Sequence, residues 1–260
     1  MPSQDDHNYR DYTETISQQV REFYRANHRF QTVEFGNSQR DKYLNHSYAK
    51  MGIWEALELL NTVIDESDPD TEFSQIQHCL QTSEAIRAKG HPRWFILVGL
   101  IHDLGKILCL RDEPQWAVTG DTFPVGCPYS EKIVFSEFFE ANPDLKNPDY
   151  QSEFGIYHAG IGLDHVMMSW GHDEYCYQVV KNYLPDPALA IIRYHSFYPW
   201  HQDNAYSELM NDHDRKMLPS VQAFQPFDLY TKHDLPPNVE QLRPFYEKLI
   251  AEFFPAQIDW

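Results

Sequence analysis

The sequence predicts an all-α protein that folds as a single domain. Apolar residues recur at spacings of three and four along most of the chain, and no series of alternating, strand-like segments is present. No linker rich in proline, glycine and serine divides the 260 residues. Because this length is long for one average domain and short for two, we expect one domain with one sizeable core.

The first part of the chain carries three helical patterns. Apolar residues at helical spacing predict a helix over 13–27 and further helical structure over 40–64. Ser74 followed by Gln77 has the pattern of a capping box, which predicts a helix over 74–89.

The centre and the end of the chain differ in character. The run 94–110 is apolar on nearly every side and is expected to be a buried central helix. The stretch 111–162 holds most of the glycines and many prolines, which predicts a loop-rich cap with one helical piece near 132–141. Helical patterns return over the segments 163–170, 172–183, 187–196, 214–224 and 239–254.

Composition limits the possible partners and the compartment. A net charge of -18 would repel nucleic acid and anionic membrane surfaces, so small neutral ligands or metal cations fit better. The four cysteines form no Cys-x-x-Cys pair. The first residues have neither the basic start nor the apolar run of a signal peptide, and no apolar run is long enough to suggest a membrane span. We therefore expect a monomeric cytoplasmic protein with reduced thiols, bound neither to nucleic acid nor to a membrane. Among its 13 histidines, those in polar contexts are expected at the surface, namely His7, His28, His46 and His91.

Three polar residues interrupt the apolar run 94–110. On a helix, Lys106 shares a face with His102, four residues before it, and with Asp103, three before it. Charged groups in a core are normally paired or bound to a metal, because burying an isolated charge is costly. An internal ion pair between Asp103 and Lys106 beside a core histidine explains this segment equally well when it is considered alone.

Further residues of the kinds that bind metals lie in apolar or aromatic contexts. They are His78, His172, His195, His201 and Asp228. Each taken singly is more often a core or rim residue than a ligand. Together with the pair at 102–103 they form a nitrogen- and oxygen-rich set without sulfur, which suits non-haem iron, manganese or zinc.

The order His78, His102-Asp103, Asp228 resembles the H…HD…D signature of the HD-domain superfamily, helical metalloproteins that are mostly phosphohydrolases. The surrounding words are more specific. They are DESDPD (65–70), HCLQTSEAIR (78–87), GLIHDLGK (99–106), EPQWAVTGDTFPVGC (113–127), MSWGHDEYCYQV (168–179), IRYHSFYPWH (192–201), FDLYTK (227–232) and LRPFYEKLI (242–250). Through these sequence motifs the chain resembles the myo-inositol oxygenase family from about Tyr9 to its end.

The resemblance implies a single HD-domain-like helical bundle over 1–260, with residues 1–30 contributing to the cover of the substrate. It implies an oxidoreductase, a di-iron oxygenase that cleaves the ring of myo-inositol with O2 to give D-glucuronate, the first step of inositol catabolism. It also implies two iron ions per chain, mixed-valent Fe(II)/Fe(III) in the active state.

The resemblance also assigns residues. One iron is expected on His78, His102, Asp103 and Asp228, and the other on Asp103, His172 and His195, so that Asp103 is the bridge. Asp103 and Lys106 are the expected catalytic residues, while His201 receives no role. The residues expected to contact the substrate are Arg10, Asp65, Glu66, Ser67, Lys106, Gly120, Asp121, His195 and Ser196.

Two alternatives remain beside this interpretation. An HD-type phosphohydrolase of a nucleotide or phosphomonoester would need several cationic side chains for the phosphate. Beyond Lys106 and Arg10, however, the motifs expected to form the site are acidic or neutral. A metal-dependent regulatory or scaffold protein would be expected to have lost a ligand or the lysine, and every such position is filled here.

Overall fold

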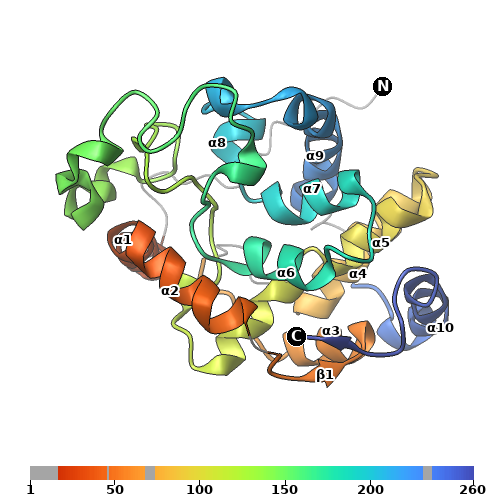
Figure 1. Ribbon diagram of the computed structural model, residues 1–260. Coiled ribbons are helices and arrows are strands. Elements are labelled where there is room, and N and C mark those ends of the chain that lie inside the picture. Colours follow the sequence, from red (N-terminus) through yellow and green to blue (C-terminus); the bar gives the residue numbers. More distant parts are fainter. Residues whose placement is uncertain (1–16, 46, 68–73, 231–235) are drawn as a thin grey trace.

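A computed structural model of the protein describes residues 17–45, 47–67, 74–230 and 236–260. Its regular elements are almost all helices, joined by loops, which confirms the predicted all-α fold (Figure 1). The α-helices are α1 (Gln18–Phe30), α2 (Val33–Leu44), α3 (Ile53–Leu60), α4 (Gln75–Ala88), α5 (Arg93–Ile101), α6 (His172–Val180), α7 (Asp186–Tyr194), α8 (Tyr198–His201), α9 (Asp212–Tyr230) and α10 (Val239–Ile250). Shorter 3-10 helices are η1 (Leu104–Arg111), η2 (Gln115–Ala117), η3 (Ser136–Ala141), η4 (Pro143–Lys146), η5 (Pro148–Tyr150), η6 (Leu163–His165) and η7 (Ser207–Leu209).

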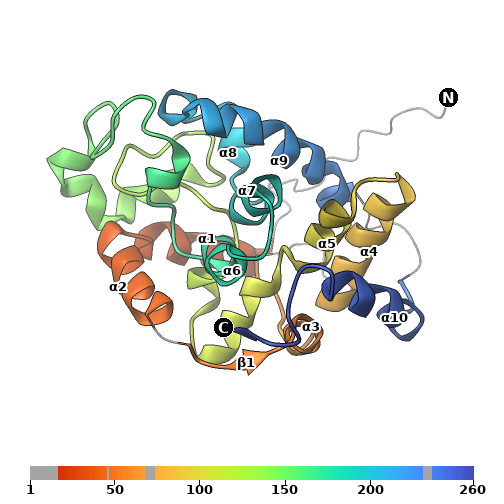
Figure 2. The ribbon, with the colours of Figure 1, turned by 45° about the vertical axis from the view of Figure 1, so that its right-hand side comes forward.

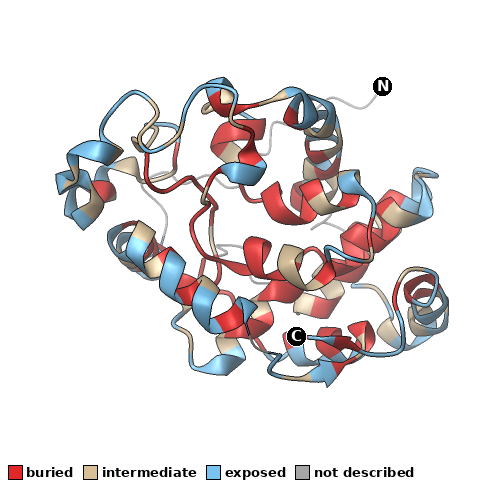
Figure 3. Cartoon of the chain, in the orientation of Figure 1, coloured by how far each residue is buried: buried red, intermediate tan, exposed pale blue. Residues whose placement is uncertain are grey.

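The core lies where α5, α6 and α7 meet. Helix α5 packs along α4, while α7 packs against both α6 and α9, and α10 contacts α4 and α5 (Figures 1 and 2). Buried residues concentrate on these central helices, and the outer faces of the peripheral helices are exposed (Figure 3). In α5, every residue from Phe95 to Ile101 is buried, as its all-round apolar sequence predicted.

The predicted continuous helix over 94–110 is wrong in its second half. The α-helix ends just before His102, and the 3-10 helix η1 follows Asp103. A Cβ on Gly105 would lie 2.0 Å from the backbone oxygen of His172, so the start of α6 sits directly against this glycine. The junction between the two kinds of helix therefore carries the His-Asp pair and brings it against α6.

Other boundaries also differ from the predictions. The stretch 40–64 is divided between the end of α2 and α3, 132–141 is helical only in η3, and 163–170 only in η6. The capping box at the start of α4 is confirmed, since the Ser74 N–H donates to Gln77 Oε1 at 3.1 Å.

One two-stranded sheet was not predicted. Strand β1 (Lys50–Met51) pairs antiparallel with β2 (Ile258–Asp259), with Lys50 opposite Asp259. Two-residue strands carry no periodicity that a sequence pattern could reveal. The pairing joins the start of α3 to the end of the chain.

The loop-rich cap has a small core of its own. Phe123, Val125, Ile133 and Phe139 are buried together, and η3 packs against α1. The expectation that His28 lies at the surface is wrong, because its ring is fully buried and stacks on Phe139 with centroids 4.1 Å apart. His28 Nε2 contacts the backbone oxygen of Val134 at 2.6 Å, so this histidine fastens α1 to the cap.

Three simpler expectations can be compared with the structure. The cysteines are all free thiols, as expected. His91 is half-buried, while His7 and His46 lie outside the described residues. Within the described part of the chain, no helix has the length and apolar character needed to cross a membrane.

Candidate metal centre

Two groups of possible ligands meet at the carboxylate of Asp103. Its Oδ2 lies 3.5 Å from His102 Nε2 and 3.8 Å from His78 Nε2. Its Oδ1 lies 3.5 Å from His172 Nε2 and 3.7 Å from His195 Nε2. Each oxygen of one buried carboxylate thus faces a different histidine pair, and in each group the ligand atoms lie within 4.8 Å of one another. This is the arrangement by which a carboxylate bridges two metal ions.

Asp228, near the end of α9, completes the first group. Its Oδ1 lies 3.1 Å from His78 Nε2 and 3.3 Å from His102 Nε2. The three residues come from α9, α4 and the end of α5, helices that contact one another in the core. Helix packing therefore brings together ligands that are 150 residues apart in the chain.

Backbone carbonyls orient three of the histidines. Nδ1 of His102 contacts Gly99 O at 3.0 Å, that of His172 contacts Val118 O at 3.0 Å, and that of His195 contacts Ile192 O at 3.1 Å. Since a carbonyl oxygen accepts, each Nδ1 is the donor, and a neutral ring then presents the lone pair of Nε2 to the centre. Metal-binding histidines are commonly held in this way.

The ammonium group of Lys106 lies between two buried carboxylates. Its ammonium donates to Asp103 Oδ2 at 2.8 Å and contacts Asp65 Oδ2 at 2.9 Å. Burial alone would raise the pKa of Asp103, but Lys106 and then His102 outweigh it and hold that pKa well below its usual range. Burial likewise opposes the charge of Lys106, but the two carboxylates raise its pKa well above its usual value. Asp103 and Lys106 are therefore both charged near neutral pH.

The residues fit a divalent metal. Nε2 of His102 is buried and makes no hydrogen bond, although two carboxylate oxygens lie within 3.5 Å of it. Lone pairs that face one another in a buried site repel unless a cation lies between them. The donor set of imidazole nitrogens and carboxylate oxygens suits iron, manganese or zinc. The two groups that share Asp103 could therefore each hold a metal ion.

Several residues that the sequence assigned to the substrate lie around Lys106 and the second group. Asp65 is buried, and its Oδ1 accepts hydrogen bonds from Ser67 N at 2.9 Å and from Ser67 Oγ at 2.6 Å. Ser196, directly after His195, lies with its Oγ 3.4 Å from His172 Nε2. Asp65, with Ser67 bound to it, thus lies beside Lys106, and Ser196 lies beside the second group.

The remaining predicted contacts differ in their placement. Asp121 is buried, and its Oδ1 accepts a hydrogen bond from the Tyr24 hydroxyl of α1 at 3.0 Å. Gly120 has φ +86°, and a Cβ there would meet the Phe23 ring at 2.7 Å, so a larger residue would push α1 away. Glu66 is exposed, and Arg10 lies outside the described residues.

Comparison with known proteins adds the identity of the family. A profile of myo-inositol oxygenases, "Myo-inositol oxygenase", matches residues 17–260. The inositol oxygenase of Dictyostelium discoideum is 50% identical over 97% of this chain and 89% of the relative. Inositol oxygenase 1 of Arabidopsis thaliana is 49% identical over 97% and 84%, and the Homo sapiens inositol oxygenase 48% over 99% and 93%. The chain belongs to the myo-inositol oxygenase family.

Membership of the myo-inositol oxygenase family confirms the resemblance found in the sequence. The profile begins in the residue before α1 and ends at the last residue, so it includes every described residue of the metal centre. His201, which received no role, lies beside the centre, where its Nε2 contacts the backbone oxygen of His195 at 2.9 Å. It therefore supports the segment that carries a ligand.

Sequence reasoning missed Asp173. Its buried carboxylate places Oδ1 2.6 Å from His172 Nε2 and 3.6 Å from His195 Nε2, and Oδ2 accepts from Thr122 Oγ1 at 3.0 Å. Burial raises the pKa of Asp173, but the two histidines outweigh burial and lower it. A metal at His172 would take the place of a proton between these atoms. The signal was a second His-Asp pair, GHDEY at 171–175, like IHDLG at 101–105.

Proposed function

We propose that this protein is an inositol oxygenase that opens the ring of myo-inositol with O2 to give D-glucuronate. The observation that carries the proposal is the convergence of two histidine pairs on the two oxygens of Asp103. Relatives about half identical to this chain over nearly its whole length are inositol oxygenases. A site for two metals inside this family supports oxidative ring opening.

The proposed cofactor is a pair of iron ions, mixed-valent Fe(II)/Fe(III) in the active state. The residues that would hold one iron are His78, His102, Asp103 and Asp228, and those for the other are Asp103, His172 and His195. When bound, the iron pair supplies the redox chemistry with O2 and the Lewis acidity that lowers the pKa of a substrate hydroxyl. The carbonyl-held histidines keep their Nε2 atoms aimed at the metal positions.

Lys106 is the proposed link between the metals and the substrate. Its ammonium is fixed by Asp65 and Asp103 at 2.9 and 2.8 Å, so it enters the reaction already oriented. It has a third hydrogen to donate to a hydroxyl oxygen of the ring. A cation at this position favours loss of a proton from that hydroxyl.

The other proposed substrate contacts suit a neutral polyol. Carboxylate, hydroxyl and backbone groups from Asp65, Glu66, Ser67, Gly120, Asp121, His195 and Ser196, with Arg10, offer both donors and acceptors to a ring that carries hydroxyls all round. Tyr24 bonds to Asp121, and the Phe23 ring lies close to Gly120. These contacts support a role for the segment 1–30 in covering the ring and excluding water.

The phosphohydrolase alternative is not favoured. A phosphate needs several cationic donors, whereas the ammonium of Lys106 is already flanked by two carboxylates. For the protein as a whole, we propose a single-domain monomer in the cytoplasm. Four unpaired thiols support the cytoplasmic location.

The proposed function is tested by supplying the iron-loaded protein with myo-inositol in an oxygen electrode. The expected result is formation of glucuronate with one O2 consumed for each molecule formed, as the balance of C6H12O6 and O2 against C6H10O7 and water requires. A panel of phosphomonoesters serves as the control and should release no phosphate. Iron-loaded, partially reduced protein that leaves inositol untouched would contradict the proposal.

A further inference from the structure

A buried ion pair lies behind the second ligand group. Arg193 Nε donates to Glu174 Oε2 at 2.8 Å, and the two side chains are only 8% and 4% exposed. Gln178 donates to the other oxygen of Glu174 at 2.9 Å.

The ion pair joins the two helix ends that carry the ligands. Glu174 comes two residues after His172, the first residue of α6, and Arg193 comes two residues before His195, which caps the end of α7. The Nε2 atoms of these histidines lie 3.3 Å apart. Because a helical turn is rigid over two residues, a cross-link between Glu174 and Arg193 fixes the distance between the histidines.

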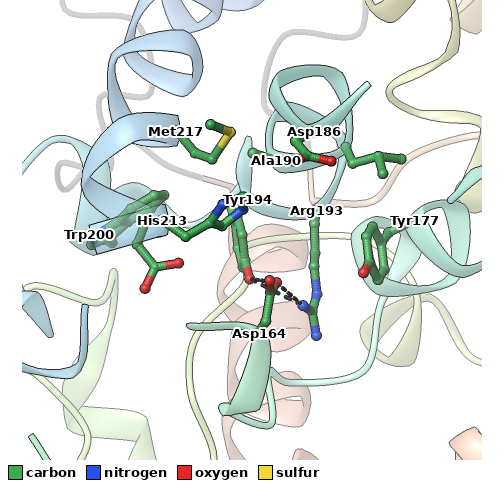
Figure 4. Close-up of a pocket in the computed structure, with 11 residues that line it drawn as sticks. Asp164, Tyr177, Asp186, Ala190, Arg193, Tyr194, Trp200, His213 and Met217 are labelled. Atoms are coloured by element: carbon green, nitrogen blue, oxygen red, sulfur yellow. Dashed lines mark hydrogen bonds and ion pairs between the residues drawn. The ribbon is translucent and has the colours of Figure 1, made fainter. Parts of the chain in front are cut away.

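Arg193 is itself fastened on its other side. Its NH1 donates to Asp164 Oδ1 at 2.8 Å and to the Tyr194 hydroxyl at 3.2 Å, and that hydroxyl lies 3.2 Å from the same Asp164 oxygen (Figure 4). The guanidinium also lies over the Tyr177 ring, 4.6 Å from its centroid. Through these contacts Arg193 connects α7, on which it lies, to α6 and η6.

The first ligand group is held by other helices. His78 lies on α4, His102 at the end of α5 and Asp228 on α9, whereas Glu174 and Arg193 lie on α6 and α7. A change in the ion pair therefore acts on the second group, and reaches the first only through the shared Asp103.

We propose that Glu174 and Arg193 are positioning residues that set the metal affinity of the His172–His195 group independently of the first group. The ion pair holds the two imidazoles at one spacing before a metal arrives, so that binding does not have to order them. This inference rests on the two-metal site of the proposed function and adds the residues that control one half of it.

A cavity beside Arg193 allows a direct test. It has a volume of about 230 Å³ and is lined by residues that include Asp164, Tyr177, Arg193, Tyr194 and Trp200 (Figure 4). The side chain of Asp164 is 50% exposed, so this side of the ion pair faces solvent. A guanidinium ion can therefore enter the space left when the arginine is shortened, and can pair with Glu174 in its place.

The experiment uses Arg193→Ala in the full chain, with Fe²⁺ bound under anaerobic equilibrium dialysis and counted by atomic absorption. Asp228→Ala is combined with it, because that change removes the Asp228 carboxylate from the first group and leaves the second as the one being measured. The expected result is a loss of about 10- to 100-fold in Fe²⁺ affinity at the second group, the usual effect of removing a residue that orients a metal ligand. Guanidinium below its denaturing range should restore the affinity, and urea at the same concentration should not.

Two further variants separate positioning from a general loss of stability. Arg243→Ala removes the exposed contacts of Arg243 with Glu58 and Glu247 and should bind two irons as the parent does. Arg193→Lys keeps the charge but lacks the planar fork that reaches Glu174 and Asp164 together, so an intermediate affinity is expected. If Arg193→Ala fails to fold, Glu174→Gln, which keeps the size of the side chain, should show the same selective loss.

The results of these experiments test the positioning role and the proposed function separately. Equal loss at both groups, unchanged affinity at the second group, or rescue by urea as well as by guanidinium would overturn the positioning role. Unmodified protein that binds two irons but leaves inositol untouched would overturn the proposed function and leave the positioning role intact.

Discussion

Replacing Asp103 with asparagine should empty one half of the metal centre and leave the other half filled. Oδ2 accepts a hydrogen bond from Lys106 at 2.8 Å, while Oδ1 lies 3.5 Å from His172 Nε2. Asparagine has one oxygen and one NH2 group, and an ammonium only donates, so Lys106 keeps the oxygen on its own side. The NH2 group then faces His172 and His195 and offers no lone pair to a metal.

The magnitude follows from the ligands that each group retains. The second group would keep two of its three protein ligands. Loss of a residue that merely orients a ligand weakens metal binding by about 10- to 100-fold, so loss of the ligand itself should exceed about 100-fold, or about 2.7 kcal/mol. The first group keeps His78, His102, Asp228 and an amide oxygen, and its loss should stay within about tenfold on the same scale.

The assay is anaerobic equilibrium dialysis against Fe²⁺ with iron counted per chain. Asp103→Asn should hold close to one iron where the unmodified protein holds two. Asp228→Ala is the matched control, since Asp228 Oδ1 contacts His78 and His102 at 3.1 and 3.3 Å and removal of this carboxylate should empty the first group. An Asp103→Asn protein that retains both irons, or loses both with equal ease, would refute the assignment of Oδ2 to the first group and of Oδ1 to the second.

Three other changes give distinct expected results. Lys106→Met should keep both irons but abolish glucuronate formation, and loss of iron would contradict a role for Lys106 in the reaction alone. The metal-free form of this variant should lose about 3–5 kcal/mol in its free energy of unfolding by urea, because two buried carboxylates lose their cation. Burial lowers the pKa of His28 from 6.5 to about 4, with the Val134 carbonyl partly opposing it, so on acidification the unfolded chain binds the proton first. The contribution of His28 to the free energy of unfolding is complete above pH 6.5 and lost by about pH 4, a change of about 3 kcal/mol. His28→Phe should remove this pH dependence, which urea unfolding between those pH values measures. Gly105→Ala should lower the melting temperature and weaken iron binding at His172, whose backbone oxygen lies 2.0 Å from the new Cβ; an unchanged melting temperature would show that α6 can move aside.

The parts of the fold that local patterns determine were predictable. The capping box at Ser74, the buried α5 and the later helices follow from spacing and from turn-forming residues. The change from α-helix to 3-10 helix after Asp103 was not predictable, because the apolar run continues through it and the cause, the approach of α6 to Gly105, comes from a segment far along the chain.

The site shows the same limit. Residue types and family motifs indicated six positions from His78 to Asp228, five of which surround the sixth, Asp103, and they also indicated Lys106. The burial of His28 could not be read from its polar neighbours, because Phe139 and Val134 approach it from the cap. Glu174 and Arg193 each look like ordinary surface charges in the sequence, and only the packing of α6 on α7 joins them.

The central claim is that two metals, shared through Asp103, act together on inositol. The most direct test is to add Fe²⁺ to metal-free protein in steps, under argon, and to measure glucuronate formation after O2 and myo-inositol are supplied at each step. We expect little product at one iron per chain and a steep rise as the second iron is bound. Full activity with a single iron, or none when two are bound, would contradict it.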